Sequence, residues 1–181
     1  MVTGSIARRW AKALFLIGEE QGSLMGLVRE VRRAADVWEV SEELRVALTN
    51  PLLAEKTRMA VLQATIRRIG VTRITKNFLL LLFEKSRLGQ LPGIAMELQR
   101  MNDEKDNRLR AEVVSAAPLA DEVVTRLKIS MQKITGKKVV VTTRRDPELI
   151  GGIITKVGDL MYDGSIRTQL ARMKEGMLGR G

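Results

Sequence analysis

Apolar residues recur at intervals of three and four along the first hundred residues of the chain. Because an α-helix turns once in about 3.6 residues, this spacing places them on one face of a helix. The pattern predicts six consecutive amphipathic helices with short connections, which together form a helical bundle. The predicted helix ends are marked by Gly22, Thr49-Asn50-Pro51, Gly70 and Gly89, and Thr72 is expected to cap the fifth helix.

Two of these helices have competing interpretations. The run Phe78–Phe83 is apolar on every side of the fifth helix. One interpretation places it at the centre of the bundle, buried on all sides. The other is that part of the run stays uncovered and forms, together with Trp10, a hydrophobic groove for a partner helix. The face of the first helix that contains Trp10 comprises Ile6, Trp10, Ala13, Leu14 and Ile17.

The pattern changes at residues 101–108, a polar run without an apolar stripe. Beyond it, apolar and polar residues alternate between Leu109 and Val113, which is typical of a β-strand. The sequence therefore predicts a mainly α chain, in which an N-terminal six-helix bundle at residues 1–105 precedes a smaller α+β domain at residues 106–181.

The predicted elements of the second domain follow the order strand, helix, strand, strand, strand, helix. Later strands are expected at 137–144, 150–157 and 160–162, and Asp163-Gly164-Ser165 is expected to open the last helix. The predicted helical stripes comprise Ala120, Val123, Val124, Leu127, Met131 and Ile134 in one helix, and Ile166, Leu170, Met173 and Met177 in the other.

The residues needed for most enzymatic chemistry are missing. Histidine and cysteine are absent, which removes the commonest general base, the commonest transition-metal ligand and any thiolate. Gly136-Lys137 follows a predicted helix instead of a strand, so it does not form a phosphate-binding loop. Gly151-Gly152 lies between strands, where a bulge or a close backbone approach is expected. Asp159 and Asp163 occupy turn positions. We therefore expect a protein that is not an enzyme and binds no cofactor or metal.

The chain is basic, with a net charge of +10 from 31 basic and 21 acidic residues. This balance raises the alternative of a nucleic-acid-binding protein. However, residues 1–105 and 106–181 each carry a net charge of +5, with no basic tail, so no nucleic-acid partner is expected. The longest uninterrupted apolar run, Phe78–Phe83, is too short to span a bilayer. The expected location is the cytoplasm, or the cytoplasmic side of a membrane complex.

Three segments together resemble the δ subunit of bacterial F-type ATP synthases, the equivalent of the mitochondrial oligomycin-sensitivity-conferring protein. They cover nearly the whole chain. The first runs from Ala7 to Phe15, and the second from Asn77 to Pro92. The third comprises Asp146–Gly152, Gly158-Asp159, Asp163-Gly164-Ser165 and Leu170.

The resemblance implies a non-catalytic stator subunit that links the catalytic head to the peripheral stalk, so that rotor torque is coupled to ATP synthesis. It implies that the first domain binds the N-terminal helix of an α subunit and that the second meets the C-terminal ends of the b subunits. It also implies a peripheral location on the cytoplasmic face of the bacterial plasma membrane, with membrane contact only through the complex. The groove residues carried over by motif are Trp10, Ala13, Leu14, Phe78, Leu81 and Leu82.

Two positions depart from the family pattern within these segments. Trp10 stands where a tyrosine is usual, which keeps a flat apolar body and exchanges the hydroxyl for an indole N–H. Ser86 stands where glycine is common. The strong basic charge also exceeds that of many bacterial relatives.

Overall fold

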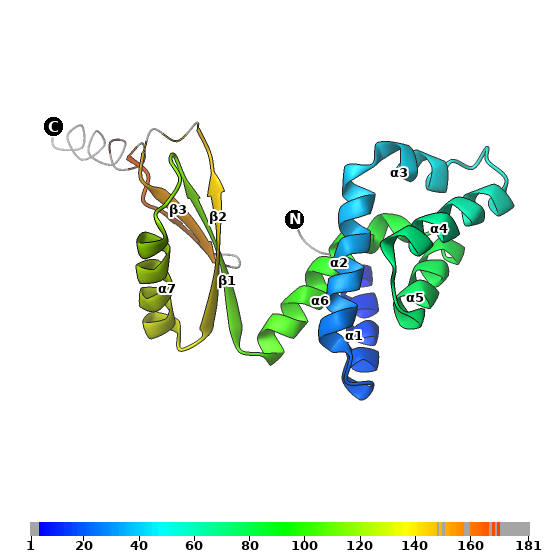
Figure 1. Ribbon diagram of the computed structural model, residues 1–181, viewed down its shortest axis with the longest axis horizontal. Helices are drawn as coiled ribbons and strands as arrows, with labels where there is room; N and C mark the ends of the chain where they lie inside the picture. Colours follow the sequence, from blue (N-terminus) through cyan, green and yellow to red (C-terminus); the bar gives the residue numbers. More distant parts are fainter. Residues whose placement is uncertain are drawn as a thin grey trace. The chain divides into compact units, whose positions relative to one another are not determined.

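The chain is mostly helical and contains a small four-stranded sheet (Figure 1). The prediction of a mainly helical chain with a smaller part that contains a sheet is confirmed. The chain divides into two compact units, Met1–Asn102 and Asp103–Gly181. The division falls within the polar run at residues 101–108. The computed structural model describes residues 4–147, 149, 151–157, 160–166, 168 and 170.

The part of the chain before the first strand folds into α-helices joined by short connections. These are α1 (Ser5–Glu20), α2 (Leu24–Val40), α3 (Glu42–Thr49), α4 (Glu55–Ile69), α5 (Arg73–Glu84) and α6 (Leu91–Lys105), with a 3-10 helix, η1 (Leu88–Gln90), before α6. Gly70 ends α4 with a φ of 68°, a left-handed conformation that favours glycine. This predicted helix end is confirmed.

Helix α1 packs into the core through a face of small residues. Ala7, Ala11 and Gly18 are buried, together with Leu14, and their spacing of four, three and four places them on one side of the helix. A Cβ atom at Gly18 would lie 3.0 Å from the Cα atom of Leu24 in α2. The two helices therefore approach closely, because small side chains separate their backbones.

The N-terminus of α5 is capped by a carboxylate from α2. Glu30 is only 9% exposed, and its Oε2 accepts hydrogen bonds from the backbone amide of Thr72 (3.0 Å), the hydroxyl of Thr72 (2.8 Å) and the hydroxyl of Thr75 (2.6 Å). A carboxylate is favoured there because the first amides of a helix lack partners and carry partial positive charge. The expected cap at Thr72 is corrected: its hydroxyl donates to Glu30 and accepts no hydrogen bond from α5.

The same contacts control the protonation of Glu30. Burial by itself raises the pKa of a carboxyl group, because it disfavours the charged form. The hydrogen bonds from Thr75 and Thr72 and the positive charge of Arg33 outweigh burial, so the pKa of Glu30 lies below its ordinary value of 4.5. The folded unit thus prefers the carboxylate form.

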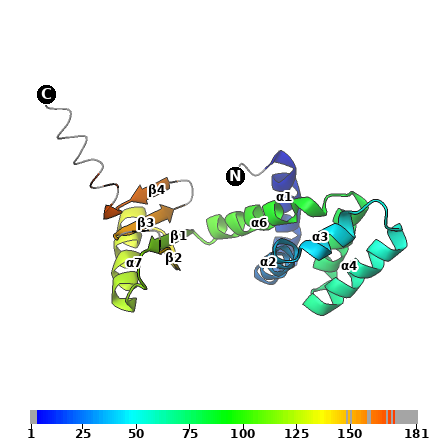
Figure 2. The same cartoon turned by 90° about the horizontal axis from the view of Figure 1, so that it is seen from above.

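The second unit is built on a sheet whose strands have the order β2-β1-β3-β4 (Figures 1 and 2). Its elements are β1 (Arg108–Ser115), α7 (Asp121–Thr135), β2 (Lys138–Arg145), β3 (Ile153–Val157) and β4 (Leu160–Asp163). Strands β1 and β2 pair in parallel and are connected through α7, whereas the other pairs are antiparallel. Ala111, Val113 and Val139 are buried, and their register places them on the same face of the sheet.

The predicted stripe of α7 is buried less than expected. None of the residues of α7 is buried; Val124, Leu127 and Met131 are partly covered, whereas Val123 is 41% exposed and Ile134 is 85% exposed. The prediction that all these residues face a core is therefore wrong. The physical reason is that one helix lies against a small sheet, which covers the centre of an apolar face and leaves its edges in water.

Gly152 brings two backbone segments into contact, as expected for the Gly151-Gly152 pair. Its φ is 85°, and a Cβ atom there would overlap the carbonyl oxygen of Gly164 and lie 2.9 Å from the Cα atom of Ser165. Strand β3 consequently begins at Ile153, three residues later than predicted, because this conformation lies outside the β region.

The predicted opening of the last helix at Asp163-Gly164-Ser165 is confirmed. The backbone amide of Ser165 donates to Oδ1 of Asp163 (2.9 Å), and the hydroxyl oxygen of Ser165 accepts from the amide of Thr168 (3.3 Å). The second contact is a typical N-cap. The predicted turn at Gly158-Asp159, and Met173 and Met177 in the predicted last helix, lie outside the described residues.

Replacement of Glu30 by glutamine is expected to lower the free energy of unfolding by roughly 1.5–3 kcal/mol, because it removes a buried charged acceptor. Since the pKa of Glu30 is lower in the folded state, the stabilisation is complete above the ordinary carboxyl range and disappears as the pH falls through the folded pKa. Urea unfolding at several pH values measures this. Glu39→Gln, an exposed change on the same helix, should have little effect, and equal losses in both variants would contradict the capping role.

Gly152→Ala is expected to destabilise the second unit by more than about 1 kcal/mol, because alanine disfavours the left-handed conformation and its methyl group meets backbone. Hydrogen exchange of the β3 amides in the full chain measures the effect. Gly151→Ala is the matched control, since a methyl group there meets only the end of the Ile166 side chain, which can rotate away. Similar protection in both variants would show that Gly152 is not required.

Candidate docking site on helices α1 and α5

Helix α1 carries a second apolar face, which stays accessible. Ile6, Trp10, Ala13 and Ile17 follow the same spacing of four, three and four as the core face, about a quarter of a turn away from it. We call these four residues the outer stripe. Ile6 and Ile17 are each 38% exposed, Ala13 is exposed and Trp10 is half-buried. The core face of α1 thus contains Ala7, Ala11, Leu14 and Gly18, while Ile6, Ala13 and Ile17 remain exposed.

Trp10 joins the outer stripe to α5. Its ring meets the ring of Phe78 edge to face, with centroids 6.0 Å apart and an interplanar angle of 64°. This geometry is favourable for an aromatic pair. Phe78 itself is only 7% exposed, so Trp10 presents the accessible part of the pair. The indole therefore forms a fixed apolar platform between the two helices.

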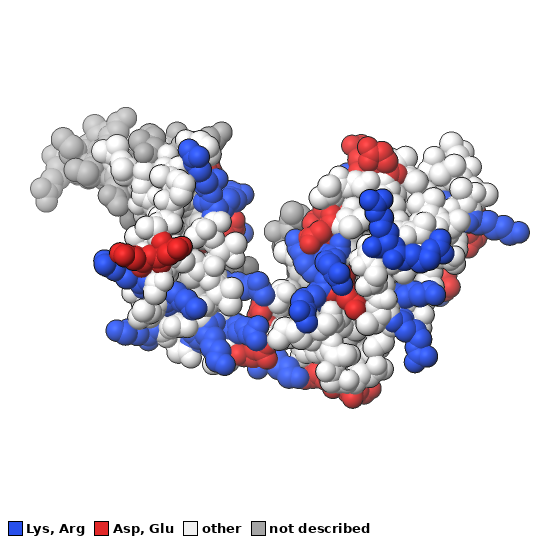
Figure 3. Space-filling view, viewed as in Figure 1, with Lys and Arg blue, Asp and Glu red and all other residues white. Residues whose placement is uncertain are grey.

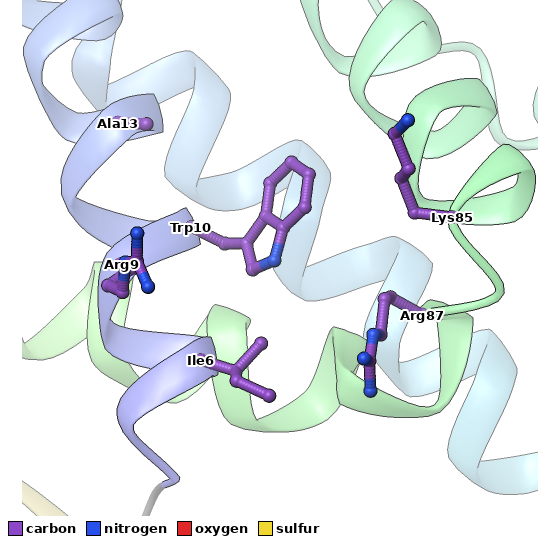
Figure 4. Close-up of a pocket in the computed structure, with 6 residues that line it drawn as sticks. All are labelled: Ile6, Arg9, Trp10, Ala13, Lys85 and Arg87. Atoms are coloured by element: carbon purple, nitrogen blue, oxygen red, sulfur yellow. The ribbon is translucent and has the colours of Figure 1, made fainter.

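A pocket of about 440 Å³ lies beside this platform (Figure 4). In Figure 4, Ile6 and Trp10 project from α1 toward the segment that carries Lys85 and Arg87. The pocket thus combines an apolar wall with cationic side chains from two different elements. Its lining comprises Ile6, Arg9, Trp10, Ala13, Lys85 and Arg87.

The turn after α5 positions the two cations of that segment. The amide of Arg87 donates to the carbonyl of Leu82 (2.7 Å), and the amide of Ser86 donates to the carbonyl of Phe83 (2.9 Å). This pair of bonds is the Schellman arrangement, which ends a helix with a left-handed residue. That residue is Ser86, with a φ of 53°. The turn therefore fixes Lys85 and Arg87 beside the pocket at the cost of a strained serine.

All the charged residues that line the pocket are basic. Arg9, Lys85 and Arg87 line it without any acidic residue. None of these three side chains forms an ion pair within the part of the chain that the structure describes, whereas Arg32 and Arg110 do. On the face of the first unit visible in Figure 3, by contrast, basic and acidic side chains are interspersed. The pocket therefore differs from that surface in carrying one sign of charge.

The structure brings together some of the predicted groove residues and buries others. Trp10 contacts Phe78, and Ala13 and Leu81 are accessible, Leu81 being 38% exposed. Leu14 and Leu82 are 2% and 0% exposed. Leu14, Phe78 and Leu82 are thus core residues that support the surface from below, and their place in a partner groove stays a prediction.

Sequence reasoning missed five residues of this surface. Ile6 and Ile17 lie on the predicted apolar face, but the sequence pattern does not separate the outer stripe from the core face that contains Leu14. Arg9, Lys85 and Arg87 were also missed. Their signal was available in part, because Lys85 and Arg87 lie within four residues after the end of the apolar run of α5.

This arrangement can bind but carries no recognisable chemistry. Among the described residues, no group of three or more acidic residues could hold a metal ion, and no helix is long and apolar enough to cross a membrane. The accessible features are an apolar stripe, an aromatic platform and a cationic pocket. Together they define a helical docking module whose surface suits an amphipathic partner.

Comparison with known proteins identifies the family. The model of the ATP synthase delta (OSCP) subunit family matches residues 6–177. The chain is 44% identical over 172 residues to ATP synthase subunit delta of Desulfosudis oleivorans, covering 95% of this chain and 94% of the relative. It is 42% identical over 170 residues to the same subunit of Desulfatibacillum aliphaticivorans, covering 94% and 93%. The chain therefore belongs to the ATP synthase delta (OSCP) subunit family.

The fold is also shared with a distant solved structure. A chain in the cryo-EM structure of the Toxoplasma gondii mitochondrial ATP synthase hexamer has a TM-score of 0.70 and 18% sequence identity, covering 97% of this chain and 98% of that chain. The resemblance inferred from the three sequence segments is confirmed by the family match. The delta (OSCP) subunit is a structural subunit of ATP synthase, so the chain is not itself a catalyst.

Ser86→Gly is expected to stabilise the first unit by about 0.5–1 kcal/mol, because glycine adopts the left-handed conformation without the steric cost that serine has. Thermal unfolding of the full chain measures this as a raised Tm. Ser86→Ala keeps the Cβ atom and should give no such gain. Equal Tm values for the glycine variant and the unmodified chain would show that the turn is not strained.

Proposed function

We propose that this chain is the stator subunit that links the catalytic head of a bacterial F-type ATP synthase to its peripheral stalk. Helices α1–α6 act as one bundle, within residues 1–105, and bind the head. Residues 106–181 bind the stalk. The family membership supports the stator role, and the exposed apolar surface on α1 and α5 is the observation that supports the division of labour.

The partner of the first unit is the amphipathic N-terminal helix of an α subunit. Its apolar face lies along the outer stripe and against Leu81, which is exposed at the edge of α5. Trp10 provides the central contact, because a large aromatic ring buries much apolar area on binding. Ala13 lets the partner backbone approach closely. The buried residues Leu14, Phe78 and Leu82 hold this surface in place.

The partners of the second unit are the C-terminal ends of the b subunits. Uncovered apolar side chains on α7 support a binding role, since Val123 and Ile134 share one edge of the helix and are 41% and 85% exposed. An apolar helix edge of this kind is stabilised when a second helix covers it. Membrane association follows only through the assembled complex, on the cytoplasmic face of the bacterial plasma membrane.

The function requires mechanical strength instead of catalysis. Each elementary charge that crosses 100 mV releases roughly 2.3 kcal/mol, and several crossings accumulate as torque before one ATP is made. A subunit that released the head under this load would dissipate the energy. A nanomolar contact corresponds to about 12 kcal/mol, and its slow dissociation is what resists the torque.

The nucleic-acid alternative loses its support. It rested on the net charge of +10, and the family match assigns the chain to a class of structural subunits. The cationic pocket is also lined partly by Ile6, Trp10 and Ala13, which suits an amphipathic helix better than a phosphate backbone.

The test is a fluorescence titration of the full chain with a synthetic peptide of the α-subunit N-terminus. A Trp38→Phe background leaves Trp10 as the single tryptophan. Trp10 emission is expected to shift to shorter wavelength as the peptide excludes water from the indole. Ile17→Asp in this background should weaken binding at least about tenfold, since 1.4 kcal/mol corresponds to that factor.

Leu16→Asp is the matched control for the titration. Leu16 precedes Ile17 on the same helix and is 49% exposed, but it lies off the outer stripe. It should leave the affinity within about twofold. Absence of binding, or equal losses in the two aspartate variants, would show that the outer stripe is not the docking surface.

A further inference from the structure

The cationic pocket lies at one end of the outer stripe. Ile6, Arg9 and Trp10 belong to the first half of α1, and Lys85 and Arg87 directly follow α5. The other end of α1 carries no matching basic group, because its last two residues are Glu19 and Glu20. The stripe therefore runs from a basic end to an acidic end.

The three cations form a set, although they come from separate elements. Arg9 is placed by the helical spacing of α1, one residue before Trp10, and the Schellman turn at Ser86 holds the other two. Part of the positive charge of Lys85 and Arg87 is neutralised by the C-terminal end of α5. The helix dipole places about half a negative elementary charge there. The three positive charges of Arg9, Lys85 and Arg87 exceed the half charge of that helix end. A surplus of positive charge therefore remains beside an apolar wall.

A partner that binds along the outer stripe needs negatively charged groups opposite these cations. Since like charges at an interface rim are repelled and opposite charges are attracted, a basic or neutral helix would bind less well at this end. The lining combines an apolar wall with cations, so the matching surface is an apolar stripe flanked by carboxylates. A free anion would leave Ile6, Trp10 and Ala13 uncovered.

We propose that Arg9, Lys85 and Arg87 select an amphipathic helix that carries acidic side chains beside its apolar stripe, and that these carboxylates lie over the pocket end of α1. The inference rests on the proposed docking of an α-subunit helix and adds what that helix must contain and which way its acidic part lies. The cations steer the encounter and fix the register of the helix, while the outer stripe supplies most of the affinity. Part of the strong basic charge of the chain is thereby assigned a role.

The test compares two peptides and two double variants by stopped-flow fluorescence of Trp10 in the full-length Trp38→Phe chain. One peptide is the N-terminus of the α subunit, and in the other every Asp and Glu is replaced by Asn and Gln. The acidic peptide is expected to associate about fivefold faster or more at low salt, with an advantage that disappears at high salt because of screening. Arg9→Gln/Lys85→Gln should remove this advantage and leave the dissociation rate nearly unchanged.

Lys12→Gln/Lys76→Gln is the control for net charge. It removes one exposed cation from α1 and one from α5, neither of which lines the pocket, and it should retain the advantage of the acidic peptide. Equal losses in both double variants would overturn the pocket's role and indicate a general effect of charge. If both peptides bind the unmodified chain equally at every salt concentration, the selection is wrong although the docking surface stands. If neither binds, the docking surface itself is wrong.

Discussion

Ala7, Ala11 and Gly18 bring the backbone of α1 close to the rest of the helical unit, and this close packing decides where the larger side chains of α1 go. At Gly18 there is no room for an indole or an isoleucine, because even a Cβ atom would lie 3.0 Å from the backbone of Leu24. Ile6, Trp10 and Ile17 are consequently left on the accessible side. The docking surface is in this sense a result of how the core is packed, and a change in the core face would rotate or displace it.

Helix α5, the second wall of this surface, is fixed at both ends by different means. Its N-terminus depends on Glu30, a side chain more than forty residues earlier in the chain. The buried carboxylate of Glu30 accepts hydrogen bonds from the amide and hydroxyl of Thr72, which directly precedes α5, and from the hydroxyl of Thr75. Its C-terminus depends on a local turn at Ser86, which sets the direction of Lys85 and Arg87. The long-range contact holds the helix in the unit, and the local turn places the charges. Neither group touches the proposed partner, yet both determine what the partner meets.

The two units bury their apolar residues to different degrees. The helical unit has a continuous core, and its exposed apolar residues include Ile6 and Ile17 of α1 and Leu81 of α5. The sheet of the second unit is covered by a helix that buries no residue completely. Both units therefore keep apolar area that a partner helix could cover. This property supports the proposal that the chain is held at two places, since the burial of apolar area on binding is favourable.

The sequence by itself determined the helical and strand segments, the polar run near the division between the units, the absence of histidine and cysteine, and the family resemblance. These properties follow from local spacing, from composition and from ordered motifs, which do not depend on how the elements pack. Only the tertiary structure decided that Leu14 faces the core while Ile17 does not, because two apolar faces a quarter of a turn apart look equally suited to burial. It also decided that Glu30 caps α5 and that Arg9 meets Lys85 and Arg87 around one pocket. These arrangements join residues far apart in the chain, and no local pattern encodes which helix faces which.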